Sequence, residues 1–203
     1  NLFVLVLKLV DTLELLCLLG QNHSFRRVVS LLSTEDQEVL ASYTFRDFVC
    51  TTQGYSLAKS LIESYITHLQ NPRVPRQKKV PIQECLALLI SKCPSYFTQS
   101  DSEIYVAEEY LRRAKQEKPT EDYIDQAMQR LLRNAAMVDL KKVVGELKYL
   151  QVYKGLVQLC LEKAKALIDI EEDPSFCYEF VFELLEEIHS SKSNFKKQEL
   201  QEL

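Results

Sequence analysis

The sequence predicts an all-α protein, built as an irregular α-helical solenoid of about ten stacked antiparallel helices. Residues that turn the chain are scarce, with 4 glycines and 6 prolines among 203 residues, where an average chain would have about 12 % of the two together. Apolar residues recur every three to four positions throughout, and no window shows convincing β alternation. The apolar stripes are wide enough for a helix that packs against two layers of neighbours, as in Phe176, Cys177, Phe180, Val181, Leu184, Leu185 and Ile188. No fixed repeat period is visible, so an irregular solenoid fits the pattern best.

The apolar spacing divides the chain into successive helices with short links between them. In chain order we expect helices over about residues 2–19, 23–32, from 35, 44–50, 55–69, 82–93, 101–117, 123–132, 140–150, 152–168, 175–190 and 194–203. Several of these starts carry capping residues, namely the pairs Thr34 with Gln37 and Ser100 with Glu103, then Asp139, and Asp173 followed by Pro174.

The four glycines have different expected roles. Gly20 is placed as the C′ residue that ends the first helix, and Gly54 is expected to break the chain before the helix from Tyr55. Gly145 and Gly155 lie inside helical patterns, where each costs about 1 kcal/mol relative to alanine. Close approach of a neighbouring helix is the expected compensation for both.

The opening stretch, residues 2–19, is the most hydrophobic part of the chain and has to be tested as a membrane span. It contains Lys8, Asp11 and Glu14, which lie along one side of a helix. Each charge costs roughly 2.5–3.5 kcal/mol at the centre of a bilayer. We therefore expect a buried solenoid helix with one solvent-exposed stripe (a wet stripe), and a lipid-contacting helix is the alternative.

Residues 71–81 form the clearest loop, with three prolines and no carboxylate. The loop carries four basic side chains, which are Arg73, Arg76, Lys78 and Lys79. We expect residues 1–203 to be a single fragment of a solenoid, with possible sub-blocks 1–71 and 81–203 joined by this loop. The loop is interpreted as a soluble connector, and a contact for nucleic acid, anionic lipid or an acidic partner segment is the alternative reading.

No combination of residues predicts catalysis, a metal site or a cofactor site. The histidines (His23, His68 and His189) have no metal-ligand spacing and are expected at the surface or half-buried. The six cysteines form no C-x-x-C pair and are expected to be free, buried thiols in a reducing compartment. Glycine-rich phosphate loops and G-x-S-x-G are absent, and the paired carboxylates are typical of solvated faces and first helical turns. We expect no catalytic, cofactor-binding or metal-binding residues, and partner-binding residues stay unknown.

The net charge and the first residues of the chain narrow the possible functions further. The net charge is −4, and a basic loop without interleaved aromatics gives little support to nucleic-acid binding. The chain opens inside an apolar run without methionine, so we expect a piece of a longer protein. A solenoid fragment is then expected to expose apolar surface near both ends, because its end units lack neighbours.

Five motifs in order resemble one family, the large inner-ring scaffold nucleoporins called the nucleoporin 155/170 family. The first combines Thr, Phe, a basic residue and Asp, the third is a Cys-Pro turn before a helix start, and the last opens a helix with an aromatic, a charged residue and glycine. They are Thr44–Val49, Leu61–Ile66, Cys93–Asp101, Leu111–Ala114 followed by Val138–Leu140, and Tyr149–Leu161. The resemblance covers about residues 13–174 and fades beyond Pro174.

The resemblance implies a middle stretch of the α solenoid that follows a β-propeller in these proteins, in the inner ring of the nuclear pore complex at the nuclear envelope. It implies a structural scaffold that binds other scaffold and linker nucleoporins through inter-helix grooves and supports nucleocytoplasmic transport. No small-molecule substrate or cofactor is implied. Membrane contact in the family is attributed mainly to the propeller, so we expect none for this fragment.

Three alternatives stay open at this point. An α-solenoid adaptor or vesicle-coat subunit would share the physics but not the compartment. A helical enzyme would need a polar pocket with perturbed titratable groups. A nuclear-envelope tether would use the basic loop Arg73–Lys79.

Overall fold

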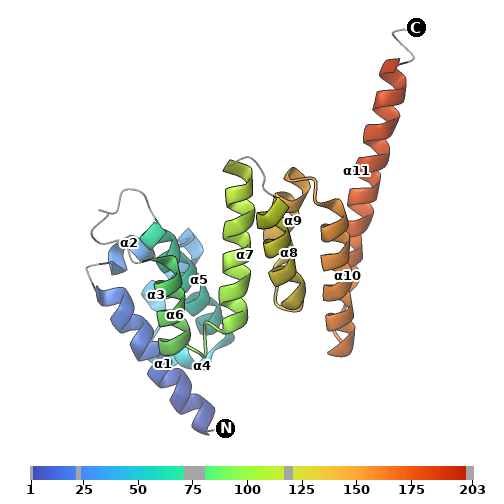
Figure 1. Cartoon of the computed structure of the whole chain (residues 1–203). Coiled ribbons are helices and arrows are strands. Elements are labelled where there is room, and N and C mark those ends of the chain that lie inside the picture. Colours follow the sequence, from blue (N-terminus) through green and yellow to red (C-terminus); the bar gives the residue numbers. More distant parts are fainter. Residues whose placement is uncertain (1, 22–23, 71–80, 117–120, 200–203) are drawn as a thin grey trace. The chain divides into compact units, whose positions relative to one another are not determined.

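The computed structural model describes residues 2–21, 24–70, 81–116 and 121–199. All regular structure in these ranges is helical, which confirms the all-α prediction (Figure 1). The helices are α1 (Leu2–Gly20), α2 (Phe25–Val29), α3 (Thr34–Ser42), α4 (Phe45–Cys50), α5 (Thr52–Gln70), α6 (Ile82–Lys92), α7 (Gln99–Gln116), α8 (Glu121–Arg133), α9 (Leu140–Tyr149), α10 (Tyr153–Asp169) and α11 (Ser175–Glu199).

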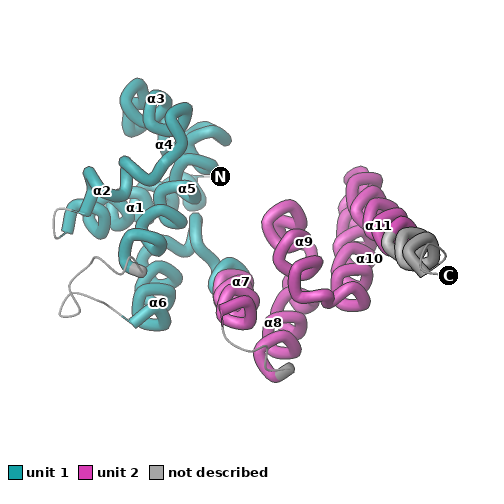
Figure 2. The backbone as a smooth tube through the Cα atoms, turned by 90° about the horizontal axis from the view of Figure 1, so that it is seen from above, with its two compact units in different colours: residues 1–102 teal, residues 103–203 magenta. Residues whose placement is uncertain are grey.

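The chain divides into two compact units, residues 1–102 and 103–203, with the boundary inside α7 (Figure 2). Each unit has its own buried core. The predicted sub-blocks 1–71 and 81–203 stay a prediction, because residues 71–80 of the joining loop lie outside the described residues.

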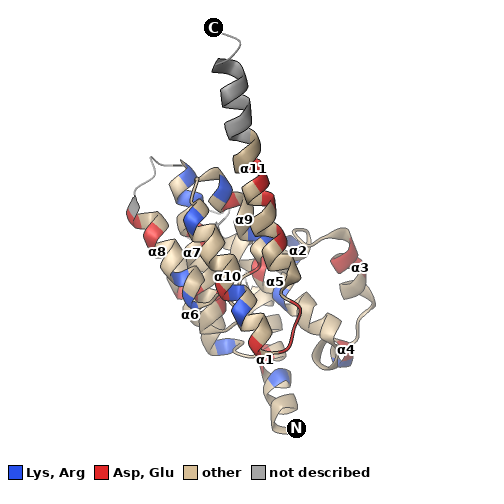
Figure 3. Ribbon diagram, turned by 90° about the vertical axis from the view of Figure 1, so that its right-hand side faces the viewer, with Lys and Arg blue, Asp and Glu red and all other residues tan. Residues whose placement is uncertain are grey.

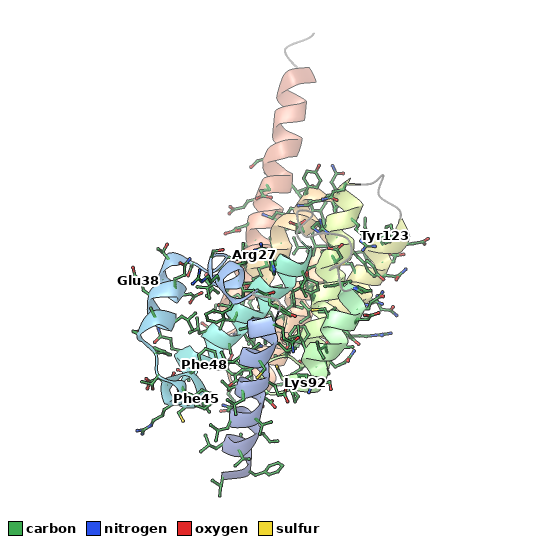
Figure 4. The ribbon with its side chains drawn as sticks, turned by 90° about the vertical axis from the view of Figure 1, so that its left-hand side faces the viewer. Arg27, Glu38, Phe45, Phe48, Lys92 and Tyr123 are labelled. Atoms are coloured by element: carbon green, nitrogen blue, oxygen red, sulfur yellow. The ribbon has the colours of Figure 1, made fainter. Side chains whose placement is uncertain are left out.

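Helix α5 is the centre of unit 1. It packs against α2, α3, α4 and α6, while α1 packs against α2, α4 and α6. One face of α5 is fully buried, and its side chains meet those of α1, α6 and the turn after α6 in the core: Leu15, Leu19, Leu57, Leu61, Ile62, Ile66, Leu89 and Tyr96. The short helix α4 contributes Phe48 to this interior, while its neighbour Phe45 stays exposed (Figure 4).

Unit 2 is organised around α10, which packs against α8, α9 and α11. Small residues allow the helices to approach, and larger aliphatic side chains fill the spaces between them. The most deeply buried members of this core are Ala107, Leu111, Ala127, Leu131, Val138, Leu147, Leu159 and Cys177. The wide stripe predicted on α11 is only partly covered within the unit, since Cys177 and Leu184 are buried whereas Phe176 and Leu185 are exposed.

The helix starts follow local capping chemistry, although two predicted caps are misplaced. Asp139 caps α9 as predicted, because its carboxylate accepts the Lys141 N–H at 3.0 Å. The cap of α3 is Ser33 and not Thr34. The capping box of α7 uses Thr98 and Asp101, two residues before the predicted pair, with the Thr98 N–H donating to Asp101 at 2.8 Å.

The glycine predictions were partly wrong. Gly20 is the last residue of α1, and neither it nor any other described glycine has a positive φ, so no left-handed C′ residue forms there. The chain breaks at Thr51, whose hydroxyl accepts the Gly54 N–H at 2.9 Å, so Gly54 lies in the first turn of α5. A Cβ on Gly155 would lie 2.9 Å from the Met128 side chain, which confirms close approach, but nothing lies within 4 Å of Gly145.

The last two predicted helices, 175–190 and 194–203, form a single helix in the structure. Helix α11 runs without interruption from Ser175 to Glu199, and residues 200–203 lie outside the described residues. The predicted gap around residues 191–193 contains Ser and Lys but no proline or glycine, so nothing in the backbone stops the helix there.

Candidate functional site

The polar stripe of α1 anchors this helix to the turn between α6 and α7. Asp11 is only 5 % exposed, and its carboxylate accepts the Ser95 N–H at 2.7 Å. Beside it, Glu14 pairs with Lys92 at 3.4 Å. The prediction of a wet stripe was therefore wrong for Asp11, because a turn 84 residues later in the chain covers it.

A buried pair of hydroxyls completes this contact. The Thr12 and Tyr96 hydroxyl oxygens lie 2.8 Å apart and are both buried. The Thr12 hydroxyl donates its only proton to the Lys8 carbonyl at 2.6 Å, so it accepts from the Tyr96 phenol. The Cys-Pro turn of the sequence motif is thus held against α1 by Asp11 and Thr12.

A polar groove of about 310 Å³ opens between α3 and α5. Hydroxyl and carboxylate residues make up most of its lining, together with two leucines: Leu31, Leu32, Ser33, Asp36, Ser60, Glu63, Ser64 and Thr67. The α5 members stand at positions 60, 63, 64 and 67, which share one helical face. Sequence reasoning missed this site, although the run of hydroxyl and carboxylate residues at helical spacing is visible in the sequence.

Ser64 is the most deeply buried of the hydroxyl residues that line this groove. Ser64 is 8 % exposed and lines the groove, and within the described part of the chain its hydroxyl makes no hydrogen bond. Thr67, one turn further on, donates to the Glu63 carbonyl at 2.8 Å.

Apolar side chains are exposed near both ends of the chain, as predicted. The first turns of α1 extend beyond the other helices of unit 1 (Figure 1), and Leu2 there is 77 % exposed. In unit 2, α11 exposes Tyr178, Phe182 and Leu185 at helical spacing, with Phe182 65 % exposed. Exposed apolar residues at such spacing are typical of surfaces that contact another helix.

The titratable groups give no support to catalysis. Burial raises the pKa of Cys85 to about 11 and that of Cys160 to about 11, and burial with nearby carboxylates raises the pKa of Cys93 to about 12. These thiols stay protonated at neutral pH and are poor nucleophiles. All six cysteines are free, but Cys17 and Cys50 are exposed, so the prediction of burial holds for only four.

The histidine prediction was wrong for one residue. His68 is 8 % exposed, and burial together with the nearby Arg27 guanidinium lowers its pKa. His189 is exposed, as predicted, and His23 lies outside the described residues. No group of three or more candidate metal ligands occurs among the described residues.

Two further sequence predictions concern binding surfaces. Among the described helices, none is both long and apolar enough to cross a bilayer. The basic residues Arg73, Arg76, Lys78 and Lys79 lie outside the described residues, so their role stays a prediction.

Helices packed around a buried core in each unit define an all-α protein, and comparison with known proteins gives its family. The family model "Non-repetitive/WGA-negative nucleoporin C-terminal" matches residues 1–202. The chain is 28 % identical over 222 residues to the probable nucleoporin C890.06 of Schizosaccharomyces pombe, covering 95 % of the chain and 16 % of that protein. It also resembles the crystal structure of Chaetomium thermophilum Nup170 SOL, with a TM-score of 0.68 and 17 % identity over 94 % of this chain and 28 % of that one.

The chain belongs to this nucleoporin family. The match reaches residue 202, beyond Pro174 where the motif resemblance ends. The family places the chain in the nuclear pore complex at the nuclear envelope, in a scaffold role, and the structural likeness shows an all-α solenoid fold. These results confirm the predicted family, fold class and location.

Proposed function

We propose that this chain is a non-catalytic segment of the inner-ring scaffold of the nuclear pore complex. In this role it binds other scaffold and linker nucleoporins through inter-helix grooves and supports nucleocytoplasmic transport. The observation that carries the proposal is a helical stack of a nucleoporin family that leaves apolar faces and a groove available for contact. Family membership favours this reading over a vesicle-coat or adaptor subunit.

The proposal includes what the chain does not do. It takes no small-molecule substrate or cofactor, it binds no nucleic acid, and this segment makes no membrane contact of its own. The raised thiol pKa values and the net charge of −4 support these points. Since the chain spans only 16 % of its curated relative, other parts of such a protein can have further roles.

Crosslinking mass spectrometry on the full-length protein in its native assembly tests the proposal. Lysines on exposed surfaces serve as reporters, including Lys141 on α9, Lys154 and Lys165 on α10. We expect crosslinks from these positions to inner-ring scaffold or linker nucleoporins. Crosslinks confined to other rings of the pore, or to vesicle-coat proteins, would overturn the placement.

A further inference from the structure

We propose that one side of unit 2, formed by α10 and α11, binds an amphipathic helix of a partner protein. The partner helix places its apolar side on the two helices and its lysine or arginine residues along the edge that meets α11. We call this surface the α10–α11 face, and its apolar residues are Leu161, Ile168, Tyr178, Phe182 and Leu185. This inference rests on the proposed scaffold function, since it specifies one binding surface and the chemistry of its partner.

The apolar stripe of α11 is wider than the part that unit 2 covers. Cys177 and Leu184 are buried in the core of the unit. Tyr178 and Leu185, each one residue later in the chain, are exposed. Phe182 stands four residues after the first and three before the second, so the three exposed side chains form one row along the helix. Anchors at positions i, i+4 and i+7 are the pattern by which one helix meets another.

Helix α10 continues this exposed apolar surface. Leu161 and Ile168 are 41 % and 54 % exposed, and each follows a buried core residue, Cys160 or Leu167, by one position. Helices α10 and α11 pack side by side and run antiparallel (Figure 1). One residue advances a helix by about 100°, and in antiparallel helices this rotation brings both sets of following residues to the same side. Leu161 and Ile168 therefore lie on the same side of the pair as the exposed row of α11.

The edge of the α10–α11 face on α11 is acidic. Glu179 and Glu186 stand three residues before and four residues after Phe182, so they lie beside it on the helix. Residues 175–190 include glutamates but no lysine or arginine, and Figure 3 shows acidic residues along α11. Within the described part of the chain, neither Glu179 nor Glu186 forms an ion pair. Both carboxylates are therefore available to a basic partner.

The opposite edge, on α10, carries the other sign of charge. Lys154 and Lys165 are exposed and stand seven residues before and four residues after Leu161, on the same side of the helix. Lys165 already pairs with Glu162 at 2.8 Å, so the uncompensated charge is concentrated on the α11 edge. Such an arrangement orients a partner helix, because its basic edge is attracted to α11 and repelled by the lysines of α10.

The charge pattern decides which occupant fits the α10–α11 face. A second copy packed α11 against α11 would bring the glutamates of the two helices together, and like charges repel. A surface of anionic lipid would be repelled by the same glutamates. An amphipathic helix with lysine or arginine at its edge covers the apolar row and also pairs with Glu179 and Glu186.

Photocrosslinking of the full-length protein in its native assembly identifies the occupant. The photoreactive residue p-benzoylphenylalanine replaces Leu185, which is half-exposed, and mass spectrometry then sequences the crosslinked peptide. We expect a segment of another protein that has apolar residues at helical spacing and at least two lysine or arginine residues along one side. A crosslink to the same polypeptide, to a second copy or to lipid would overturn the proposal, and so would the absence of any crosslink.

A matched control uses the same photoreactive residue at Phe45, an exposed apolar position on α4 of unit 1. This position lies outside the α10–α11 face and should not crosslink to the segment that Leu185 identifies. Equal crosslinking of that segment from both positions would mean that it binds apolar surface without selection, which would overturn the proposal.

The acidic edge is tested with the crosslinked segment as a labelled synthetic peptide, whose affinity for the 203-residue chain is measured by fluorescence anisotropy. Glu179→Gln with Glu186→Gln should weaken binding by about threefold or more. The matched control, Glu35→Gln with Glu38→Gln, removes the same charge from α3 in unit 1 and should change affinity by less than about 1.5-fold. Equal weakening by both variants would overturn the role of the acidic edge.

The apolar row is tested by Phe182→Ser, which should weaken the peptide by about tenfold or more. Phe182 is 65 % exposed, so the chain should stay folded, and circular dichroism checks the helix content. Retained affinity in a folded Phe182→Ser chain would contradict the α10–α11 face as the binding site. If that happens while Lys141 still crosslinks to inner-ring nucleoporins, the scaffold function stands and only this inference fails.

Discussion

The hydroxyl pair of Thr12 and Tyr96 predicts an unequal response to removing either partner. Thr12→Val deletes the acceptor of the phenol and leaves the Tyr96 hydroxyl buried, in a side chain that is 1 % exposed, without a partner. Such a loss costs about 1–3 kcal/mol of unfolding free energy. Tyr96→Phe removes only the donor, and Thr12 keeps its bond to the Lys8 carbonyl. That change should cost about 0.5–1.5 kcal/mol.

The double variant gives the sharper test. Once Thr12 is valine, the buried phenol hydroxyl destabilises the folded chain, because it has lost its partner. Replacing both partners by apolar groups of similar shape is nearly neutral. Adding Tyr96→Phe to Thr12→Val should therefore raise stability by about 1 kcal/mol. If the double variant proves less stable than Thr12→Val alone, the Tyr96 hydroxyl does not depend on Thr12 as its partner, and the reasoning is refuted.

The assay needs one global and one local readout. Urea denaturation followed by circular dichroism gives the free energy of unfolding, and hydrogen exchange measured by mass spectrometry reports on α1 and residues 93–97. Thr67→Val is the matched control, since Thr67 is exposed and also donates to a carbonyl four residues earlier. It should change stability by less than about 0.5 kcal/mol.

Three further predictions concern single positions. Gly54→Ala should lower the free energy of unfolding by about 1–3 kcal/mol in urea denaturation, because the new Cβ would clash with the Phe48 carbonyl oxygen. Gly145 is exposed with open space around it, so Gly145→Ala should raise the free energy of unfolding by about 0.5–1 kcal/mol. Equal effects of the two substitutions would refute this contrast. For Asp101, burial raises the pKa, but hydrogen bonds from Thr98 and the Lys59 ammonium outweigh burial and lower the pKa overall. The stability that the Asp101 carboxylate contributes is therefore present above about pH 4 and is lost as the pH falls through the lowered pKa of the folded state. Between pH 6 and pH 3, urea denaturation should show a smaller loss of stability for Asp101→Asn than for the unchanged chain, and an equal loss would contradict this account. Iodoacetamide at pH 8 should label the exposed Cys17 and Cys50 in the native chain, with mass spectrometry finding no label on the buried thiols, which are Cys85, Cys93, Cys160 and Cys177.

The sequence by itself determined where most helices and one helix cap lie, because these features depend on residues close together in the chain. Helix formation depends on neighbours within four residues, so apolar spacing predicted where most helices lie. Asp139 caps α9 because its partner N–H is two residues away. Where several Ser and Thr residues stand together, as around Ser33 and Thr98, local preferences are nearly equal, and the predicted caps were off by one or two residues.

Glycines show the limit of local reasoning. Gly145 and Gly155 lie in similar helical patterns, yet Met128 of another helix meets only Gly155. Which neighbour a helical face meets depends on how the helices pack, and a single sequence does not record that packing.

Tertiary structure alone decided how distant segments of the chain meet. Asp11 became a buried anchor because Ser95, 84 residues away, returns to α1. The groove exists because residues 31–36 fold back onto the Ser60–Thr67 face of α5. The sequence determined the helices and the family, since both depend on local pattern and ordered motifs. Only the packing of α10 against α11 decided which of their apolar side chains stay exposed, because apolar spacing marks a wide stripe without showing which part of it meets a neighbour.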